Sequence, residues 1–180
     1  GKLAPGIFRL TEHIEHIYTS FPEGRIRKEE LALEGATGAA LEKELERKGI
    51  HISDYAQDML TSKEFVSSKN KEQIALVRLR VKDLFPDGNT HTTTEIYDRA
   101  ETLGLELCPA AVGPAYRLKY TDQPLGEWFQ VAMKQIAGRG GNPGVFDLGR
   151  GDGGLWLLDY GATPEGGWGP GSVFVFSPRK

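Results

Sequence analysis

A histidine-rich turn near the start of the chain could bind a metal ion. Glu12, His13, Glu15 and His16 lie close together, and the two histidines are three residues apart. In a helix this spacing places both imidazoles on one face, and imidazole is a common ligand of transition metals. The spacing matches neither the HExxH nor the HxxEH pattern of zinc proteases, and no third ligand is evident. We therefore interpret this turn as a solvated helix face and predict no bound metal or cofactor.

Cys108 is the only cysteine, so a thiol nucleophile would need His51 or His91 as its base. A catalytic thiol requires an accessible, electropositive setting, whereas free cysteine is among the most buried residue types. Leu105 and Leu107 are close to it in the sequence. We expect Cys108 to be a buried apolar residue. A lone cysteine also favours the reducing cytoplasm, because it cannot form an internal disulfide.

Two glycine-rich stretches, residues 138–144 and 149–154, could cradle a phosphate. Neither ends in the Gly-Lys-Ser/Thr sequence of a phosphate-binding loop, and neither is followed by a helical pattern. Glycine, asparagine and proline at these spacings favour tight turns between short strands. A GxSxG motif is also absent from the sequence, so we recognise no catalytic motif.

A basic stripe is the first candidate binding surface. Cations alternate with apolar or aromatic residues in two segments expected to be strands, 77–82 and 116–120. Side by side, such strands would form a cationic face with nearby aromatic rings, which is typical of single-stranded nucleic-acid binding. Its six residues are Arg78, Arg80, Lys82, Arg117, Lys119 and Lys134. Because the net charge is −3, we favour the interpretation of a wet face on a half-buried sheet.

An aromatic cleft is the second candidate. Trp128, Trp156 and Trp168 lie in the glycine-rich part of the chain, and loop 121–127 offers polar residues beside them. An apolar wall with a few polar groups is the usual composition of a small-molecule site. The residues assigned to ligand binding are Arg117, Tyr120, Asp122, Gln123, Glu127, Trp128 and Trp156. The alternative that stays open is that the tryptophans pack in the core.

The composition is that of one globular domain. The chain has 180 residues, of which 39% are hydrophobic and 26% are charged. No apolar run reaches the ~20 residues that a membrane helix needs, so we expect no membrane partner.

The elements that must position these residues change in type along the chain. Before residue 66 the apolar spacing is helical. Helices are expected after Thr11, over residues 37–48 with Gly49 as the stop, and after Ser53. The polar stretch 67–71 is a linker candidate, which separates a helical N-terminal part, residues 1–66, from a second part, residues 72–180.

Beyond residue 72 the pattern alternates with a period of two, apart from one helix over 92–103 that begins with the capping box Thr92-x-x-Glu95. Strands are expected at 77–82, 116–120, 128–136, 145–148, 155–158 and 173–176. Of the 23 glycines, 13 lie between residues 138 and 171, where they would form turns. The sequence predicts an α+β fold, in which the N-terminal helical part packs with a five- or six-stranded, mainly antiparallel sheet around one continuous core.

The segment Thr94 to Pro109, together with the segments 117–120, 122–128 and 141–143, resembles a family of small, uncharacterised bacterial proteins. The resemblance covers roughly residues 50–180. It implies a bacterial, cytoplasmic origin. It brings no catalytic residues, because the family has no established activity.

Because no signature of catalysis, metal binding or phosphate binding is recognised, we predict a non-catalytic binding or accessory module of the bacterial cytoplasm. Its partner would be a small molecule or another protein, with nucleic acid less favoured. Two alternatives stay open. One is an enzyme whose site surrounds the 121–128 loop, and the other is a protein that binds single-stranded nucleic acid through the basic face.

Overall fold

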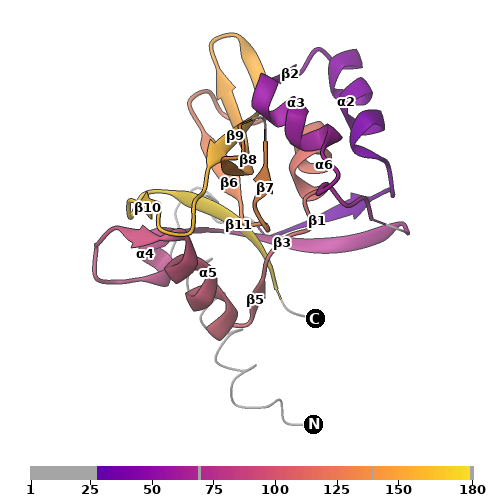
Figure 1. Ribbon diagram of the computed structural model, residues 1–180. Coiled ribbons are helices and arrows are strands. Elements are labelled where there is room, and N and C mark those ends of the chain that lie inside the picture. The colour runs from indigo at the N-terminus through magenta and orange to yellow at the C-terminus, as the bar shows by residue number, and fades with distance from the viewer. Residues whose placement is uncertain (1–27, 69, 139, 179–180) are drawn as a thin grey trace.

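The computed structural model describes residues 28–68, 70–138 and 140–178 (Figure 1). The predicted helix after Thr11, with His13 and His16, lies outside the described residues. The elements in chain order are β1 (Lys28–Leu33), α2 (Gly38–Arg47), β2 (His51–Ile52), α3 (Asp54–Thr61), β3 (Glu72–Arg80), α4 (Val81–Leu84), β4 (His91–Thr92), α5 (Thr93–Thr102), β5 (Leu105–Glu106), α6 (Val112–Lys119), β6 (Trp128–Val131), β7 (Ile136–Ala137), β8 (Pro143–Gly151), β9 (Gly154–Gly161), β10 (Gly167–Trp168) and β11 (Val173–Pro178).

The main sheet of the described chain has nine strands and is mixed. Seven strands follow the order β1-β3-β11-β6-β8-β9-β2, while β5 pairs with β11 and β7 pairs with β8. The β11–β6 and β2–β9 pairs are parallel, and the other pairs are antiparallel. The α+β class is therefore confirmed, but the sheet is larger and less uniformly antiparallel than predicted.

Helix α6 lies inside the curl of this sheet. It contacts β1 at one edge of the sheet and β8 and β9 near the other edge, and it also contacts α2. Helices α2 and α3 pack beside it, whereas α4 and α5 lie at the far end of β3 (Figure 1). The curl leaves an opening between β1 and α2, and the candidate functional site lies there.

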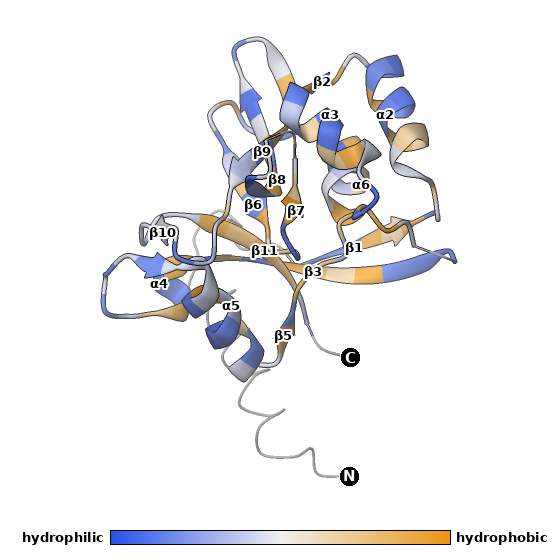
Figure 2. Cartoon of the chain, in the orientation of Figure 1, coloured by the Kyte–Doolittle hydropathy of each residue, from blue (hydrophilic) through white to orange (hydrophobic). Residues whose placement is uncertain are grey.

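The buried apolar side chains form one continuous cluster. It includes Leu41 and Leu45 of α2, Phe146 of β8, and Phe174 and Phe176 of β11. Hydrophobic residues are concentrated in the central strands, while α2 and α5 are largely hydrophilic (Figure 2). Burial of this cluster is the main favourable contribution to folding.

Three helix starts were predicted, at Thr37, at Ser53 and, from a capping box, at Thr92, and the structure confirms them. The hydroxyls of Thr37, Ser53 and Thr92 each accept a hydrogen bond from a backbone N–H in the first turn. Glu95 completes the predicted capping box. Gly49, after α2, has a φ of 71°, the left-handed conformation expected of a helix stop.

The predicted strand over residues 116–120 is wrong, because these residues end helix α6. Their alternating pattern spans only five residues, and such a short pattern does not separate a strand from a helix that is buried on most sides. Tyr116 and Tyr120 are one helical turn apart, and their rings stack with a centroid distance of 5.5 Å. Pro114 fits because it lies in the first turn, where its missing N–H needs no partner.

Two further expectations about element types need correction. The first described element is strand β1, although the whole segment before residue 66 was expected to be helical. The strand predicted over residues 128–136 is interrupted, since β6 ends at Val131 and β7 begins at Ile136. The strands predicted at 145–148, 155–158 and 173–176 are confirmed within β8, β9 and β11.

Strand β3 does not have the wet face that its alternating cations predicted. Arg78 is only 3% exposed, because its face of β3 is covered by α6 and the 120–127 segment. The Arg78 guanidinium lies 4.4 Å from the ring centroid of Phe129 and 4.8 Å from that of Tyr120. The faces of aromatic rings attract a cation. The Arg78 guanidinium can therefore be buried against these rings and does not need to be exposed to water.

His91 links α4, β4 and α5. Its Nδ1 pairs with Glu95 at 3.0 Å, its Nε2 pairs with Asp87 at 2.9 Å, and its ring stacks on Phe85 at 3.6 Å. Hydrogen bonds to Asp87 and then Glu95 raise the pKa of His91 above its usual 6.5, and His91 in turn lowers the pKa of both carboxyls. The charged imidazole is therefore favoured by folding.

This arrangement predicts that the stability supplied by His91 falls as pH rises. A group whose pKa is higher in the folded state contributes fully below its unfolded pKa and loses that contribution as pH rises through the folded pKa. The melting temperature of the wild type should exceed that of His91→Gln most clearly below the usual pKa of 6.5, and the gap should narrow as the pH rises through the raised pKa of His91. Thermal melts of both proteins across this range measure the gap. A gap that stays constant with pH would contradict the assignment.

Candidate functional site

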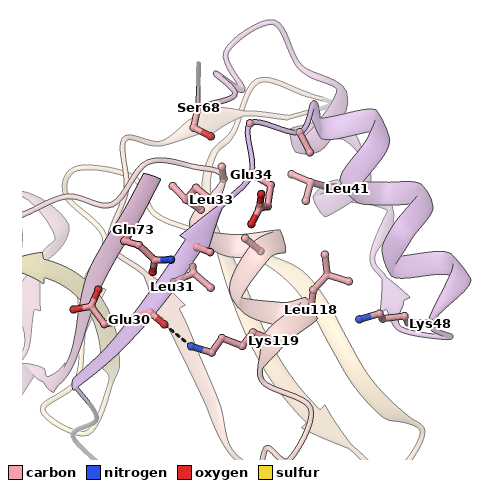
Figure 3. A pocket seen from close by; sticks show the side chains of 15 residues that line it. Glu30, Leu31, Leu33, Glu34, Leu41, Lys48, Ser68, Gln73, Leu118 and Lys119 are labelled. Atoms are coloured by element: carbon pink, nitrogen blue, oxygen red, sulfur yellow. Dashed lines mark hydrogen bonds between the residues drawn. The ribbon is translucent and has the colours of Figure 1, made fainter. Parts of the chain in front are cut away.

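A pocket of about 600 Å³ lies between strand β1 and helices α2 and α6 (Figure 3). We call it the β1 groove. Its lining is mostly apolar, with charged side chains at the margins. The lining residues are Glu30, Leu31, Ala32, Leu33, Glu34, Gly35, Ala36, Leu41, Lys48, Ser68, Gln73, Ala111, Ala115, Leu118 and Lys119.

Strand β1 is the edge of the sheet in the part of the chain that the structure describes. It pairs antiparallel with β3 on one side, and the β1 groove lies along its other side. A further strand added to the sheet would therefore occupy the groove. Edge strands expose backbone N–H and C=O groups that can pair with another chain.

The backbone of β1 faces this groove at every second residue. Glu30 lies opposite Ala75 of β3, and its carbonyl accepts a hydrogen bond from the Lys119 ammonium, which approaches from the side of β1 that is away from β3 (Figure 3). In an antiparallel pair, residues bonded to the partner alternate with residues that are not. Glu30 and Ala32 therefore both direct their backbone N–H and C=O toward the groove.

The walls of the groove are fixed by close packing of the helices. Gly38 begins α2 so close to α3 that a Cβ atom there would lie 1.7 Å from the Leu60 carbonyl oxygen. Leu41, one turn later, forms the α2 wall. On α6, Ala115 and Leu118 form the opposite wall, and both are only partly buried. The groove thus has apolar walls and an open mouth.

The polar residues predicted around loop 121–127 do come together, but they form an internal network. Arg117 is fully buried. Its Nη1 donates to Gln123 Oε1 at 2.7 Å, and to the carbonyls of Gly149 and Trp156 at 3.2 Å each. Its Nη2 donates to the Tyr120 carbonyl. The network joins the end of α6 to the β8–β9 hairpin.

Glu127 is the acceptor that connects this network to β3. Its Oε1 accepts from Arg78 Nη1 at 2.7 Å and from the Tyr120 hydroxyl at 2.9 Å. Burial raises the pKa of the Tyr120 hydroxyl and Glu127 adds to this rise, whereas Arg78 opposes it. Asp122 is exposed and lies apart from these hydrogen bonds. A role for these residues in ligand binding stays a prediction.

The three tryptophans occupy different settings. Trp128 is 43% exposed and lies over Gly149, where its ring fills the space of a Cβ atom. Trp156 is half-buried and stacks on His51 with a centroid distance of 4.6 Å. Trp168 is buried, and its Nε1 donates to Thr93 Oγ1 at 2.8 Å. None of the three lines the β1 groove.

The residues of the predicted basic stripe do not share one exposed face. Arg78 and Arg117 are buried, and Arg80 pairs with Asp83 at 3.1 Å. Lys82 and Lys134 are exposed, whereas Lys119 lies in the β1 groove. The alternation that suggested the stripe combined strand β3 with two helices, because Lys82 lies in α4 and Arg117 and Lys119 lie in α6, so the cations point in different directions.

Cys108 is buried, as predicted. Its thiol donates to the Val175 carbonyl at 3.5 Å, and burial raises the pKa of the thiol. Both ring nitrogens of His91 are engaged by carboxylates, as described above. Among the described residues, no group of three or more His, Cys, Asp or Glu side chains is arranged to hold a metal ion.

Asp147 is a buried carboxylate in the middle of β8. Gln130 Nε2 donates to its Oδ2 at 2.9 Å, and burial raises the pKa of Asp147 to about 6. A raised carboxyl pKa is a frequent property of general acids and bases, but ordinary buried carboxyls have it as well. Asp147 does not line the β1 groove.

No family model, curated protein or solved structure matches this chain. In the described ranges, no helix combines the length and the apolar character needed to cross a membrane.

Proposed function

We propose that this protein is a binding module that takes up an extended segment of a partner protein along the edge of β1. The observation that carries the proposal is the Glu30 carbonyl, which turns away from β3 and toward the β1 groove. Its present donor, the Lys119 ammonium, is an exposed side chain that a backbone N–H of a docking strand can replace. Strand addition of this kind is a recurrent mode of peptide recognition.

The dimensions of the groove suit such an occupant. An added strand lies about 4.8 Å from its neighbour, and its side chains alternate between the two faces of the sheet. One set of side chains would point into the space between Leu41 and Leu118, where an apolar group removes apolar surface from water. The backbone would supply affinity, and this apolar contact would supply selectivity.

We also propose that this binding module acts in the bacterial cytoplasm, which is the interpretation that the sequence favours. An enzyme with a site at loop 121–128 is less favoured, because Arg78, Tyr120 and Gln123 already engage the half-buried Glu127.

Proline at position 32 should abolish strand addition. The N–H of Ala32 points into the groove, so proline removes a donor that β3 does not use, and proline is tolerated at edge positions of this kind. We expect Ala32→Pro to weaken binding at least tenfold, since about one hydrogen bond is lost and the ring obstructs the docking strand. The matched control Ala32→Ser keeps the N–H and should bind as the wild type does.

The probe is a peptide selected from a random twelve-residue library displayed against the full chain, and its affinity is measured by fluorescence polarisation. Ala115→Arg, which fills the groove from α6, provides a second variant should Ala32→Pro unfold. Equal affinities in all four proteins, or no selected peptide, would refute the proposal. Sedimentation that shows a dimer of the wild type but not of Ala32→Pro would identify a second copy as the occupant instead.

A further inference from the structure

The charged side chains of the β1 groove are separated along its length. Lys119 ends α6 and Lys48 follows α2, and both lie at the end of the groove beside Leu118 (Figure 3). Glu34 lies toward the other end, where its carboxylate is 3.6 Å from the Lys71 ammonium. Within the described part of the chain, neither Lys48 nor Lys119 forms an ion pair.

Strand addition would leave Lys119 without its present partner. The Lys119 ammonium donates to the Glu30 carbonyl, which is the acceptor that a docking backbone N–H would take. An ammonium displaced to the wall of a filled groove loses part of its hydration, and an unpaired charge in such a place is unfavourable. A carboxylate on the occupant would restore a hydrogen bond, and a charge-assisted bond is stronger than the one lost.

The position of the lysines also fixes which part of the occupant they meet. Glu30 is the third residue of β1, so an added strand can continue past Lys119 as far as Lys28. The lysines therefore face the interior of the added strand and not its terminus. The apolar contact at Leu41 and Leu118 comes from the same side of the groove, so both anchors of the occupant point to one face of the added strand and are an even number of residues apart.

We propose that the occupant of the β1 groove carries an aspartate or glutamate on the same face as its apolar anchor, and that this carboxylate takes over Lys119 from the Glu30 carbonyl, with Lys48 beside it. This inference rests on the proposed function. In the free protein Lys119 then covers the Glu30 carbonyl of the edge strand, and in the complex it binds the carboxylate of the occupant. Lysine on an edge is a known protection against unwanted strand pairing.

The test uses the tightest peptide selected on the full chain, synthesised with acetylated and amidated ends. A second version has its acidic residue replaced by glutamine. Binding of both is measured to the wild type, Lys119→Met, Lys48→Met and the control Lys43→Met, which is exposed on α2 but does not line the groove. Lys119→Met removes the cation and also uncovers the Glu30 carbonyl.

We expect the acidic peptide to bind the wild type about fivefold more tightly than the glutamine version, as for a partly exposed ion pair. Lys119→Met should remove this preference and bind the glutamine version as tightly as the wild type or more so. Lys48→Met should reduce the preference, and Lys43→Met should keep it. Raising the salt from about 0.05 M to about 0.5 M should diminish it, because the pair is exposed to screening.

The outcomes separate this inference from the proposed function. Peptides that depend on the Ala32 N–H but show no preference for an acidic residue would overturn the inference and leave strand addition intact. An unchanged preference in Lys119→Met would overturn it as well. Selected peptides that ignore Ala32→Pro would refute the proposed function itself.

Discussion

Replacing Arg117 with methionine is expected to lower the free energy of unfolding by about 4 kcal/mol, the usual cost when one partner of a buried charged network is removed. The side chain is fully buried. Its guanidinium donates to four oxygen atoms, which belong to Gln123 and to the backbones of Tyr120, Gly149 and Trp156. Methionine fills a similar volume but donates to none of them.

The burial of the guanidinium has the opposite effect on stability. Whether Arg117→Met lowers or raises the free energy of unfolding depends on the cost of burying the charge compared with the value of its hydrogen bonds. Burial lowers the pKa of Arg117 to about 10, so the charged form is disfavoured in the folded state, although it persists at neutral pH. Methionine would remove that cost. We expect the loss to prevail because four acceptors would lose their donor in the interior, and each buried acceptor without a partner costs about 1–3 kcal/mol.

Thermal melts monitored by circular dichroism measure the effect. For a chain of this size, about 4 kcal/mol corresponds to a decrease of roughly 10 °C in the melting temperature. Arg150→Met is the matched control, because Arg150 is exposed and donates one hydrogen bond, to the Gln123 carbonyl at 2.9 Å. It should change stability by less than about 1 kcal/mol. An equal or higher melting temperature for Arg117→Met would show that burial of the charge outweighs its hydrogen bonds.

Local physical chemistry made the helix starts predictable. Thr37, Ser53 and Thr92 accept hydrogen bonds from N–H groups only three residues ahead, so a few neighbouring residues carry the whole signal. The strands β8 and β9 were predictable for a similar reason. Their hairpin turns between Gly151 and Gly154, and Gly154 has a φ of 119° that other residues rarely adopt.

The segments β1 and α6 were not predictable, because contacts distant in sequence decide them. The β1 segment Lys-Glu-Glu-Leu-Ala-Leu consists of good helix formers, and it is a strand because Leu31 and Leu33 are buried beside β3. Helix α6 carries Pro114 and Tyr116, and the surrounding sheet buries most of its surface. Tertiary packing prevails over propensity in both segments.

The candidate site also combines features that could be predicted from the sequence with features that could not. Arg117, Gln123 and Glu127 are near neighbours in sequence, and their association was predictable from spacing, whereas the burial of Arg117 was not, since charged residues are rarely buried. The β1 groove combines residues 30–36, 41–48 and 111–119, and no local pattern indicates that these segments meet. The one signal available in the sequence was the alternation of leucine with alanine at Leu31, Ala32 and Leu33. In the structure the two leucines are buried and the alanine is exposed.

Gly38→Ala is expected to destabilise the protein by about 3 kcal/mol, although alanine is the better helix former. Alanine at an exposed helical position gains about 1 kcal/mol over glycine. Here the added methyl would lie 1.7 Å from the Leu60 carbonyl oxygen and 3.2 Å from the ring of Phe65. The first neighbour is backbone and cannot turn aside, so α2 and α3 must separate. Overpacking of this kind costs typically 1–3 kcal/mol, and more when backbones collide.

Chemical denaturation of Gly38→Ala and the control Gly138→Ala tests this expectation. A Cβ atom at Gly138 meets nothing within 4 Å, so the control should remain within about 0.5 kcal/mol of the wild type. Gly149→Ala gives a graded comparison, because its methyl would collide with the Trp128 ring. That ring is 43% exposed and can rotate outward, so we expect a smaller loss than at Gly38.

The same substitution connects stability with the proposed binding. Helix α2 supplies Leu41 to the β1 groove and Lys48 directly follows it, and the position of α2 against α3 depends on the contact between Gly38 and Leu60. Under conditions in which Gly38→Ala is still folded, we therefore expect weaker peptide binding together with lower stability. Gly149→Ala lies outside the groove and should bind as the wild type does. Equal binding by the folded Gly38→Ala protein would mean that α2 does not set the width of the groove.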